Sequence, residues 1–470
     1  MNKKQHVKPA RIGILGFGRE GKSVLKYLKK SSQFKKAKVE VLDKKSGANY
    51  LKGLARFDLI FRSPGVPYNL PELKKAREDG VAFSSVTRLF FENYKGKTIG
   101  VTGTKGKGTT STLIYKILKA AGKKVFLAGN IGKSAIEALA KNRNTPMAVL
   151  EFSSFQLHDL DLSPEVAVML DVFPDHQDAH TNLQEYYEAK ANIGRFQSAP
   201  PAGGRRKGDK IFYFTDNAMS RKLAMKSPAQ KVGVDYRKFK EFKKEDLMIK
   251  GIHNFRNAVM AATVAKSFGV DWATIRKVAK SFRGLEHRLE FIRQIVFKRK
   301  KHSNILQNVR MFFYNDSAST NPTTTAAALE AFSDPPSLKL RRASKKILIA
   351  GGQDKGLDYS PLRIALKKYE TEAVILFGEN RNKIRAAIKN SAKVIFVKNL
   401  EEAVRLAYRV EKDSDANMRM HTNDTNKESV AVIFSPGAAS FDMFQDYADR
   451  GRKFKGLVNR LTLDTRNLKN

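Results

Sequence analysis

The sequence predicts an α/β protein built on parallel sheets, and three observations lead to this expectation. Short apolar runs typical of strands alternate with segments of helical periodicity along the chain. Glycine-rich turns follow two of the expected strands. The length of 470 residues is too great for one hydrophobic core and allows about two to four domains. We therefore expect three α/β domains, covering residues 1–95, 96–291 and 292–470.

The first expected domain has the pattern of a Rossmann-like fold. A glycine turn, Gly16-Phe-Gly-Arg-Glu-Gly21, separates its first strand from its first helix. Asp43 ends the second strand about twenty residues after the turn, as the acidic residue does in dinucleotide sites. The glycine pattern is a weak signal, and read alone it indicates NAD binding. The expected strands are 11–15, 38–42 and 58–61, and the expected helix is 22–29.

The second expected domain contains the most informative stretch of the chain, GVTGTKGKGTT at residues 100–110. Gly103, Gly106 and Lys107 lie between an expected strand and an expected helix, as in a phosphate loop. Glycines let backbone N–H groups approach phosphates, the helix N-terminus favours anions, and Lys107 can reach the β- and γ-phosphates. This second nucleotide motif predicts a P-loop ATPase-like domain rather than a dehydrogenase. The alternative interpretation of the stretch is an ordinary glycine-rich turn between a strand and a helix. The expected elements are strands 97–102, 147–150 and 165–170 and helices 109–121, 183–197 and 254–268.

Two further stretches of this domain carry possible metal ligands. Glu151 follows an expected strand and suits Mg²⁺, although a glutamate here could simply cap the strand. Asp175-His176-Gln-Asp178 follows the next strand and could bind metal or transfer a proton, although a lone histidine is more often structural. Lys190 lies in an expected helix, and composition alone predicts a solvated surface lysine.

The third expected domain repeats the alternation of strands and helices and predicts another parallel, Rossmann-like sheet. Its expected strands are 292–297, 309–314, 347–350, 373–377, 393–397 and 430–434. Polar hairpin tips or loops are expected at 297–308, 338–346 and 412–428, and a basic loop in the second domain at 199–210.

Composition excludes several classes of protein. No stretch approaches eighteen consecutive apolar residues, so we expect no membrane span. The absence of cysteine excludes disulfides and thiolate chemistry, and without an export signal we expect a cytoplasmic protein. The 88 Lys and Arg against 46 Asp and Glu give a net charge of +42. That charge is spread along the chain without a nucleic-acid recognition motif, so it favours anionic substrates over nucleic acid.

Taken together, the motifs are similar to those of the Mur ligase family, over nearly the whole chain. A single matching motif would be weak evidence for the family, but a series of motifs in the family's order is specific. The glycine- and serine-rich motifs of the third domain favour the D-glutamate-adding branch of the family. In order along the chain, the matching stretches are GTKGKGTT (103–110), GNIGKSAIEAL (129–139), LEFSSFQL (150–157), DHQD (175–178), YEAK (187–190), KGIHN (250–254), GLEHRLE (284–290), YNDS (314–317), GGQDKG (351–356) and SPGAASFD (435–442).

The resemblance implies a role for each matching position. Lys107, His176 and Lys190 would be catalytic, with Lys190 N-carboxylated and helping Glu151 and His176 to hold Mg²⁺. ATP would contact Gly103, Thr104, Lys105, Gly106, Lys107, Gly108, Thr109, Asn254, Arg288 and Asp316. The UDP-linked substrate would contact Gly18, Arg19, Asp43, Lys44, Ser63, Gly65, Asn130, Ser153 and Gln156. D-Glutamate would contact Thr320, Lys355, Ser440 and Tyr447.

The reaction that the resemblance implies is ATP-dependent formation of an amide bond. D-Glutamate would be added to UDP-N-acetylmuramoyl-L-alanine through an acyl phosphate, in cytoplasmic peptidoglycan precursor synthesis by a monomeric enzyme. His176 or a nearby carboxylate is a candidate base for the amine. Two other interpretations remain open: another Mur-type or folylpolyglutamate-like ligase, and a basic NTPase acting on nucleic acid.

Three positions depart from the family pattern. Gly108 stands where a serine or threonine normally contacts Mg²⁺. Lys105 replaces a polar residue within the loop and adds a positive charge. Ala318 stands where some members carry a lysine. Gly108 raises the sharpest question, which is how magnesium is held without that hydroxyl group.

Overall fold

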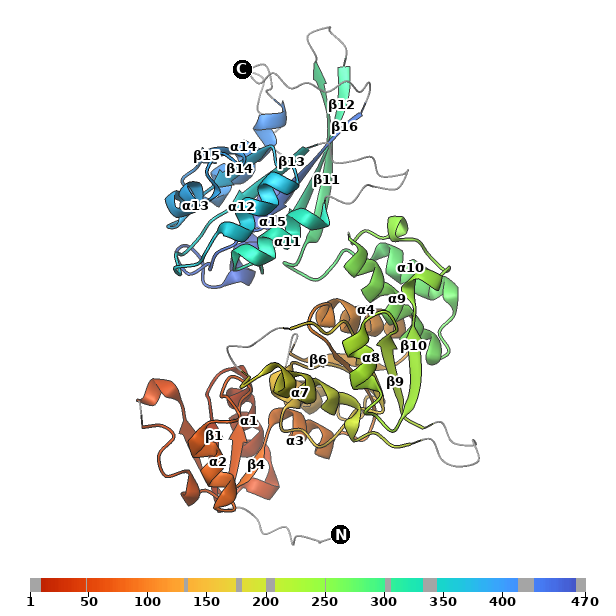
Figure 1. The fold of residues 1–470 in the computed structure, drawn as a ribbon, viewed down its shortest axis with the longest axis vertical. Coiled ribbons are helices and arrows are strands. Elements are labelled where there is room, and N and C mark those ends of the chain that lie inside the picture. The colour runs from red at the N-terminus through yellow and green to blue at the C-terminus, as the bar shows by residue number, and fades with distance from the viewer. Residues whose placement is uncertain are drawn as a thin grey trace. The chain divides into compact units, whose positions relative to one another are not determined.

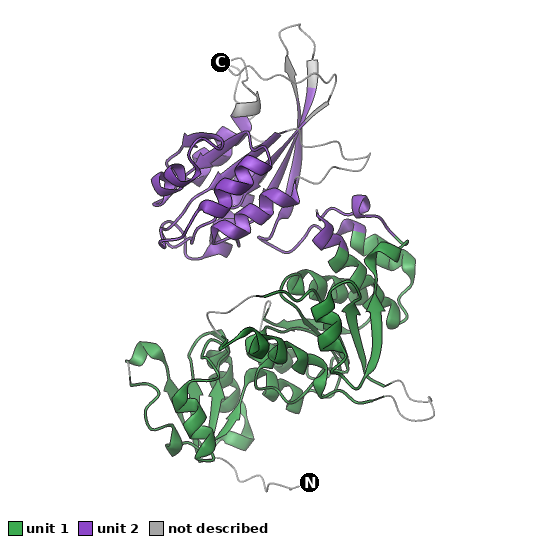
Figure 2. Cartoon of the chain, viewed as in Figure 1, with its two compact units in different colours: residues 1–241, 256–279 green, residues 242–255, 280–470 purple. Residues whose placement is uncertain are grey.

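The computed structural model describes residues 10–47, 49–130, 134–174, 180–199, 208–249, 251–300, 306–332, 345–412 and 427–461. The chain divides into two compact units, which Figure 2 shows in separate colours. Unit 1 comprises residues 1–241 and 256–279, and unit 2 comprises residues 242–255 and 280–470. Unit 1 contains two sheets and unit 2 contains one, so the predicted α/β class with three sheets is confirmed.

The first sheet of unit 1 is parallel, with strand order β2-β1-β3-β4. Its first helix begins at Arg19, inside the glycine turn, rather than at the predicted residue 22. Gly21 explains the tight turn, because a Cβ at this position would overlap the carbonyl oxygen of Gly16. The elements are β1 (Arg11–Leu15), α1 (Arg19–Lys30), β2 (Lys38–Leu42), β3 (Leu59–Arg62), α2 (Pro71–Glu78), β4 (Ala82–Ser84) and α3 (Val86–Asn93).

The second sheet of unit 1 is also parallel, with strand order β10-β9-β8-β5-β7-β6. Its predicted strands and helices are present with shifts of a few residues at their ends. Its elements are β5 (Lys97–Thr102), α4 (Lys107–Ala120), β6 (Val125–Gly129), α5 (Ala135–Asn142), β7 (Met147–Glu151), α6 (Ser154–Leu157), β8 (Val166–Met169), α7 (Leu183–Arg195), β9 (Lys210–Phe214), α8 (Ala218–Ala224), β10 (Gln230–Val234), α9 (Ile252–Ser267) and α10 (Trp272–Ser281).

The sheet of unit 2 has strand order β11-β12-β16-β13-β14-β15, and Figure 1 labels its strands. The prediction of a purely parallel sheet is wrong at its edge, because β11 pairs antiparallel with β12. Only five residues separate the end of β11 from the start of β12, and so short a connection permits only antiparallel pairing. The elements are β11 (Glu290–Lys300), β12 (Leu306–Asn315), α11 (Pro322–Ala331), β13 (Lys345–Ala350), α12 (Ser360–Lys368), β14 (Ala373–Leu376), α13 (Arg381–Ile388), β15 (Lys393–Phe396), α14 (Leu400–Lys412), β16 (Lys427–Phe434) and α15 (Tyr447–Arg460).

Helices cover both faces of the unit 2 sheet (Figure 1). Successive residues of a strand point to opposite faces. Ile347 and Ile349 of β13 accordingly pack with α14 and α15, whereas Leu348 and Ala350 pack with α11, α12 and α13. A strand buried on both faces reads as a continuous apolar run, and that is why β13 could be predicted from the sequence.

The two sheets of unit 1 share one apolar core. Ile14 and Phe61 of the first sheet belong to the same buried cluster as Leu150 and Met169 of the second. Helix α3 contributes Phe90, which is completely buried against the rings of Tyr94 and Phe126. The division predicted after residue 95 therefore separates two sheets that pack together in one compact unit.

Candidate active site

The phosphate loop connects β5 to α4 in the centre of the second sheet of unit 1. Gly106 has φ +83° and forms the N-cap of α4. A Cβ at this position would overlap the side-chain amide of Asn257 on α9. Gly103, with φ +154°, is similarly close to Leu170. Both glycines are therefore required by the backbone, and the loop presents the N-terminus of a fourteen-residue helix.

We expect Gly106→Ala to abolish tight ATP binding. The substitution strains a left-handed backbone, at about 1–3 kcal/mol, and pushes the loop away from Asn257. The dissociation constant for a fluorescent ATP analogue measures the loss. The double variant Gly106→Ala, Asn257→Ala removes the overlap but retains the strain, so it should recover part of the affinity. Unchanged affinity in Gly106→Ala contradicts this account of the loop.

Two lysines far apart in the sequence meet at the phosphate loop. The Lys107 Nζ donates to the carbonyl oxygens of Gly103 at 3.1 Å and Thr104 at 3.0 Å. The Lys190 Nζ, on α7, donates to the same Gly103 carbonyl at 2.8 Å and lies 4.6 Å from the centre of the Tyr186 ring. Lys190 is only 2% exposed, so the expectation of a solvated surface lysine is wrong. Tertiary packing places its amine beside the loop.

The carboxylate of Glu151 lies at the end of β7, next to the strand that leads into the loop. It is 6% exposed, and its Oε1 accepts a hydrogen bond from the Asn130 Nδ2 at 2.9 Å. Glu151 pairs with Val101 of β5, two residues before Gly103. Mg²⁺ prefers oxygen ligands, so the buried Glu151 carboxylate beside the phosphate loop is chemically suited to bind it. His176, the third predicted ligand, lies outside the described residues.

An ion-pair network that the sequence did not predict supports the loop from outside. The Arg256 guanidinium bonds to Asp171 at 2.6 and 3.0 Å and to Asp216 at 2.6 and 3.0 Å. The carbonyl of Asp171 accepts from the Thr104 backbone N–H at 2.8 Å. Burial lowers the pKa of Arg256, but the two carboxylates outweigh it and raise that pKa above its ordinary value. Asp171 and Asp216 follow the ends of β8 and β9, and Arg256 lies in α9, so no spacing rule links them.

The predicted nucleotide contacts of the first sheet gather around its glycine turn. Asp43 accepts backbone hydrogen bonds from Lys45 at 3.0 Å and Phe17 at 2.5 Å, which lower the pKa of its carboxyl. The Ser63 hydroxyl donates to the Gly16 carbonyl at 2.7 Å. A Cβ at Gly18 or Gly65 would contact nothing within 4 Å, and Lys44 is exposed.

Arg19 and Gln156 connect the two sheets of unit 1. Arg19 donates to the carbonyls of Gly129 and Asn130 at 3.3 and 3.2 Å. The Gln156 Nε2 donates to Glu20 at 2.6 Å, a buried carboxyl whose pKa burial raises. Ser153 and Gln156 also form the capping box of α6. The structure thus brings the predicted contacts Arg19, Asn130 and Gln156 to one boundary between the sheets, where sequence analysis missed Glu20.

Asp316 is a buried hydrogen-bond centre of unit 2. Its carboxylate accepts from the hydroxyls of Ser319 at 2.5 Å and Ser435 at 2.8 Å and from the Leu289 backbone at 3.1 Å. Burial raises its pKa to about 6, although these hydrogen bonds oppose the shift. Its contacts fix the turn after β12 against the turn after β16. A direct contact of Asp316 with ribose stays a prediction.

Arg450 on α15 holds the same two turns and was missed by sequence analysis. It is completely buried and donates to the Ser317 Oγ at 3.1 Å and to the carbonyls of Ser317, Ala438 and Ala439 at 3.0, 3.0 and 3.1 Å. An arginine within a basic sequence gives no signal of such burial. Its four hydrogen bonds position the turns that carry Thr320 and Ser440.

The other predicted contacts of unit 2 are more exposed. Lys355 lies 5.5 Å from the centre of the Phe441 ring, and Tyr447 is 46% exposed with its ring edge-on to His287. Asn254, Arg288 and Asp316 belong to unit 2, whereas the phosphate loop belongs to unit 1. One nucleotide site formed by residues of both units therefore stays a prediction.

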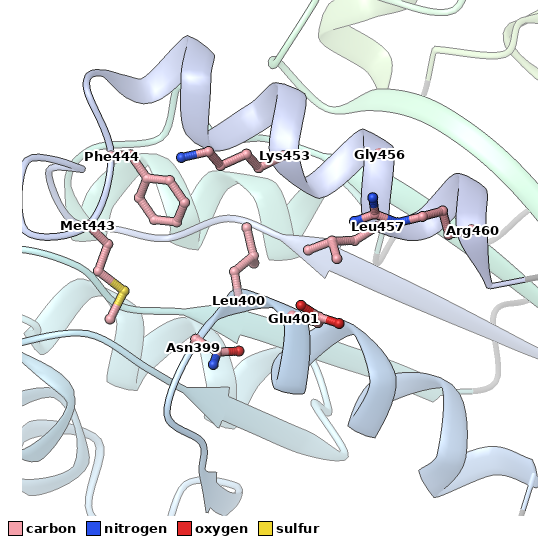
Figure 3. A pocket seen from close by; sticks show the side chains of 9 residues that line it. All are labelled: Asn399, Leu400, Glu401, Met443, Phe444, Lys453, Gly456, Leu457 and Arg460. Carbon is pink, nitrogen blue, oxygen red and sulfur yellow. The ribbon is translucent and has the colours of Figure 1, made fainter. Parts of the chain in front are cut away.

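A cavity of about 440 Å³ in unit 2 contains none of the predicted site residues (Figure 3). It lies between the start of α14 and one side of α15, where Leu400, Phe444 and Leu457 supply apolar surface and Lys453 and Arg460 supply charge.

Among the described residues, no helix is both long and apolar enough to cross a bilayer.

Comparisons with known proteins identify the class to which this fold and loop belong. Residues 101–266 match the family model described as the Mur ligase middle domain. The fold is similar to that of UDP-N-acetylmuramate-alanine ligase from Thermotoga maritima, with TM-score 0.52, 16% identity and coverage of 97% of this chain and 100% of that one. It is also similar to folylpolyglutamate synthase from Mycobacterium tuberculosis, with TM-score 0.53, 14% identity and coverage of 79% and 94%.

The chain belongs to the Mur ligase family, whose members are ATP-dependent ligases. Its sequence relatives carry one particular name within that family, UDP-N-acetylmuramoylalanine--D-glutamate ligase. The protein of that name from Acetivibrio thermocellus is 34% identical over 97% of both chains. The one from Clostridium acetobutylicum is 36% identical over 88% of this chain and 85% of the relative. The family and its ligase activity, expected from the ordered motifs, are confirmed.

Proposed function

We propose that this protein joins D-glutamate to UDP-N-acetylmuramoyl-L-alanine with the hydrolysis of ATP to ADP and phosphate. The observation that carries the proposal is the 34% identity over 97% of both chains to a ligase named for these substrates. The charged groups at the phosphate loop support the proposal, because phosphoryl transfer requires the negative charge of the phosphates to be neutralised where the reaction occurs. These groups are Lys107, the neighbouring Glu151 and the buried Lys190. We further propose that the first sheet binds the UDP-linked substrate and that unit 2 binds D-glutamate.

In the proposed mechanism the protein mainly positions reactants and balances charge. The terminal carboxylate of the UDP-linked substrate attacks the γ-phosphorus of ATP, forming an acyl phosphate and releasing ADP. The amine of D-glutamate, after losing a proton, attacks the acyl carbon, and the tetrahedral intermediate expels phosphate. Lys107 holds the β- and γ-phosphates as charge moves onto the leaving ADP. The loop backbone orients the γ-phosphate, and Asp171 with Arg256 keeps the loop in place.

Mg²⁺ would be held by Glu151, by His176 and by Lys190 if that lysine is N-carboxylated. When bound, the ion would neutralise phosphate oxygens and orient them. The amine of Lys190 now contacts the Gly103 carbonyl, and a carbamate on it would convert a cation beside the phosphates into an anionic oxygen ligand. We also propose that the protein acts in the cytoplasm as a monomer.

The proposal is tested by phosphate release from ATP in the presence of UDP-N-acetylmuramoyl-L-alanine and single amino acids. We expect release with D-glutamate and not with L-glutamate, L-alanine or glycine. Mass spectrometry of the product should show one added glutamyl residue. Release with a different amino acid identifies a sibling ligase. Release that no amino acid changes, or that RNA or DNA stimulates, refutes the proposed function.

Gly108 leads to a separate prediction about magnesium. Gly108 is the second residue of α4 and is buried. We expect Gly108→Ser to lower the Mg²⁺ concentration for half-maximal rate by up to about tenfold, because its hydroxyl would replace a bound water whose immobilisation costs about 0–2 kcal/mol. Gly456→Ser, at an exposed glycine of α15 where an added side chain meets nothing within 4 Å, is the control. An unchanged Mg²⁺ requirement in Gly108→Ser means that another group already fills that position.

A further inference from the structure

Two histidines and a glutamate meet where α6 and α7 lie close together in unit 1. His158 follows the last residue of α6, while His180 and Glu185 flank the start of α7. The His158 Nε2 is 3.1 Å from the Glu185 Oε1, and the His180 Nδ1 is 3.5 Å from the same oxygen. All three donor atoms lie within 4.8 Å of one another. None of these residues is among the predicted ligands of Mg²⁺.

We propose that His158, His180 and Glu185 bind one divalent transition-metal ion, with Zn²⁺ as the best match. A tetrahedral zinc ion with bonds of about 2.0–2.1 Å requires donor atoms separated by about 3.3 Å. The two distances to the Glu185 oxygen lie on either side of that value. Two imidazoles and one carboxylate leave a fourth position for water or another ligand. Imidazole nitrogens favour Zn²⁺ over Mg²⁺, which prefers oxygen.

The carboxylate of Glu185 is held in place by the start of α7. The Glu185 Oε2 accepts from the Thr181 backbone N–H at 2.9 Å, and the Glu185 N–H donates to the Asn182 side chain at 2.9 Å. These contacts fix Glu185 in the first turn of the helix and direct its Oε1 to the histidines. A ligand that is already oriented loses little entropy when the ion binds.

The two imidazole rings are oriented by neighbouring residues. His180 is stacked on Phe155 at 5.0 Å with an interplanar angle of 7°, and its Nε2 is 3.0 Å from the Ser154 hydroxyl. In the tautomer that donates from Nε2 to Ser154, the His180 Nδ1 carries the lone pair a metal needs. The His158 ring lies 4.5 Å from the ring of Tyr68. Such outer contacts are typical of histidines that bind metals.

The charges around the three side chains suit a cation. Burial lowers the pKa of His158 to about 4, so its imidazole is neutral at pH 7. Burial opposes ionisation of Glu185, but hydrogen bonds from Thr181, together with the neighbouring His158 and His180, outweigh it, so the pKa of this carboxyl is lowered. The positive charge of Arg62 is offset by Asp159 at 3.0 Å. The side chains of His158 and Glu185 are 14% and 16% exposed, which leaves an entrance for the ion.

A bound ion would join α6 to the start of α7, the helix that carries Lys190. Its expected effect is to stabilise unit 1 through these two helices, because an ion that binds only the folded state shifts unfolding by mass action. The inference rests on the ligand geometry alone and does not depend on the proposed reaction.

The test uses the full chain, without a histidine tag, freed of metal by a chelator. Titration with ZnCl₂ in a calorimeter should show one strong site per chain. His158→Ala and Glu185→Gln should each weaken it by about 100-fold or more, since even loss of an outer contact costs about 10- to 100-fold. His253→Ala removes a histidine elsewhere and His176→Ala removes a predicted Mg²⁺ ligand, and both should retain the site. Zn²⁺ binding that survives His158→Ala but not His176→Ala overturns the proposal.

X-ray absorption of the wild-type protein with one equivalent of Zn²⁺ gives a second readout that needs no variant. We expect scattering from two imidazole rings and a coordination number of four. A spectrum without imidazole scattering, or the absence of a strong Zn²⁺ site in the wild type, overturns the proposal even if the variants fail to fold.

Discussion

Lys190→Ala should reduce the rate of ligation by about 10³-fold, the loss typical of removing one positioned charge from a transition-state site. The Lys190 Nζ is buried against the Gly103 carbonyl and the Tyr186 ring, so alanine would leave a space beside the phosphate loop. If the active form of Lys190 is a carbamate, acetate can enter that space and supply the missing carboxylate. Steady-state phosphate release with and without sodium acetate measures both effects.

Lys190→Arg separates the two possible roles of this side chain. A guanidinium keeps the positive charge but cannot carry the carbamate, so Lys190→Arg should be as inactive as Lys190→Ala and should not respond to acetate. Lys222→Ala, an exposed lysine on α8, is the control and should retain full activity. Carbon-13 NMR of the wild type with labelled bicarbonate should show one carbamate signal. A wild-type rate in Lys190→Ala leaves this lysine without a catalytic role.

Arg450→Met should lower the stability of unit 2 by about 3 kcal/mol. The substitution removes the guanidinium donor from the Ser317 hydroxyl and from the carbonyls of Ser317, Ala438 and Ala439. The Ala439 carbonyl keeps its hydrogen bond from the Gln353 N–H, and each buried acceptor left without a partner costs about 1–3 kcal/mol. Methionine fills part of the volume, so the loss comes mainly from hydrogen bonding. Burial lowers the pKa of Arg450 to about 10, so the guanidinium is still charged at pH 7.

Urea unfolding can assign the loss from Arg450→Met to the correct unit. The single tryptophan of the chain, Trp272, belongs to unit 1, so its fluorescence follows unit 1, whereas circular dichroism follows both units. We expect the dichroism transition to move to lower urea and the fluorescence transition to move less. Arg452→Met, with a side chain 59% exposed, is the control and should change stability by less than about 0.5 kcal/mol. An unchanged dichroism transition contradicts the role assigned to Arg450.

Local sequence patterns predicted the elements that depend on local chemistry. The β5–loop–α4 unit could be found because its glycines and lysine must follow one another in the chain to form the turn. Strands such as β13 could be found because burial on both faces requires a continuous apolar run. The antiparallel pairing of β11 with β12 was missed, although the hairpin tip expected at 297–308 is compatible with it, because the direction of the sheet was predicted from the alternation of strands and helices alone.

The residues of the candidate site also fall into two groups, those that the sequence predicted and those that it did not. The phosphate loop, the strand-end carboxylate at Glu151 and the ordered series of ligase motifs could be read from the amino-acid sequence, because each is a short run of residues with its own chemistry. The burial of Lys190 at the loop, the bridge from Arg256 to Asp171 and Asp216, and the support that Arg450 gives to two turns became visible only in the folded protein. These contacts join residues far apart in the chain, and burial and pairing are properties of the folded surroundings rather than of the residues themselves.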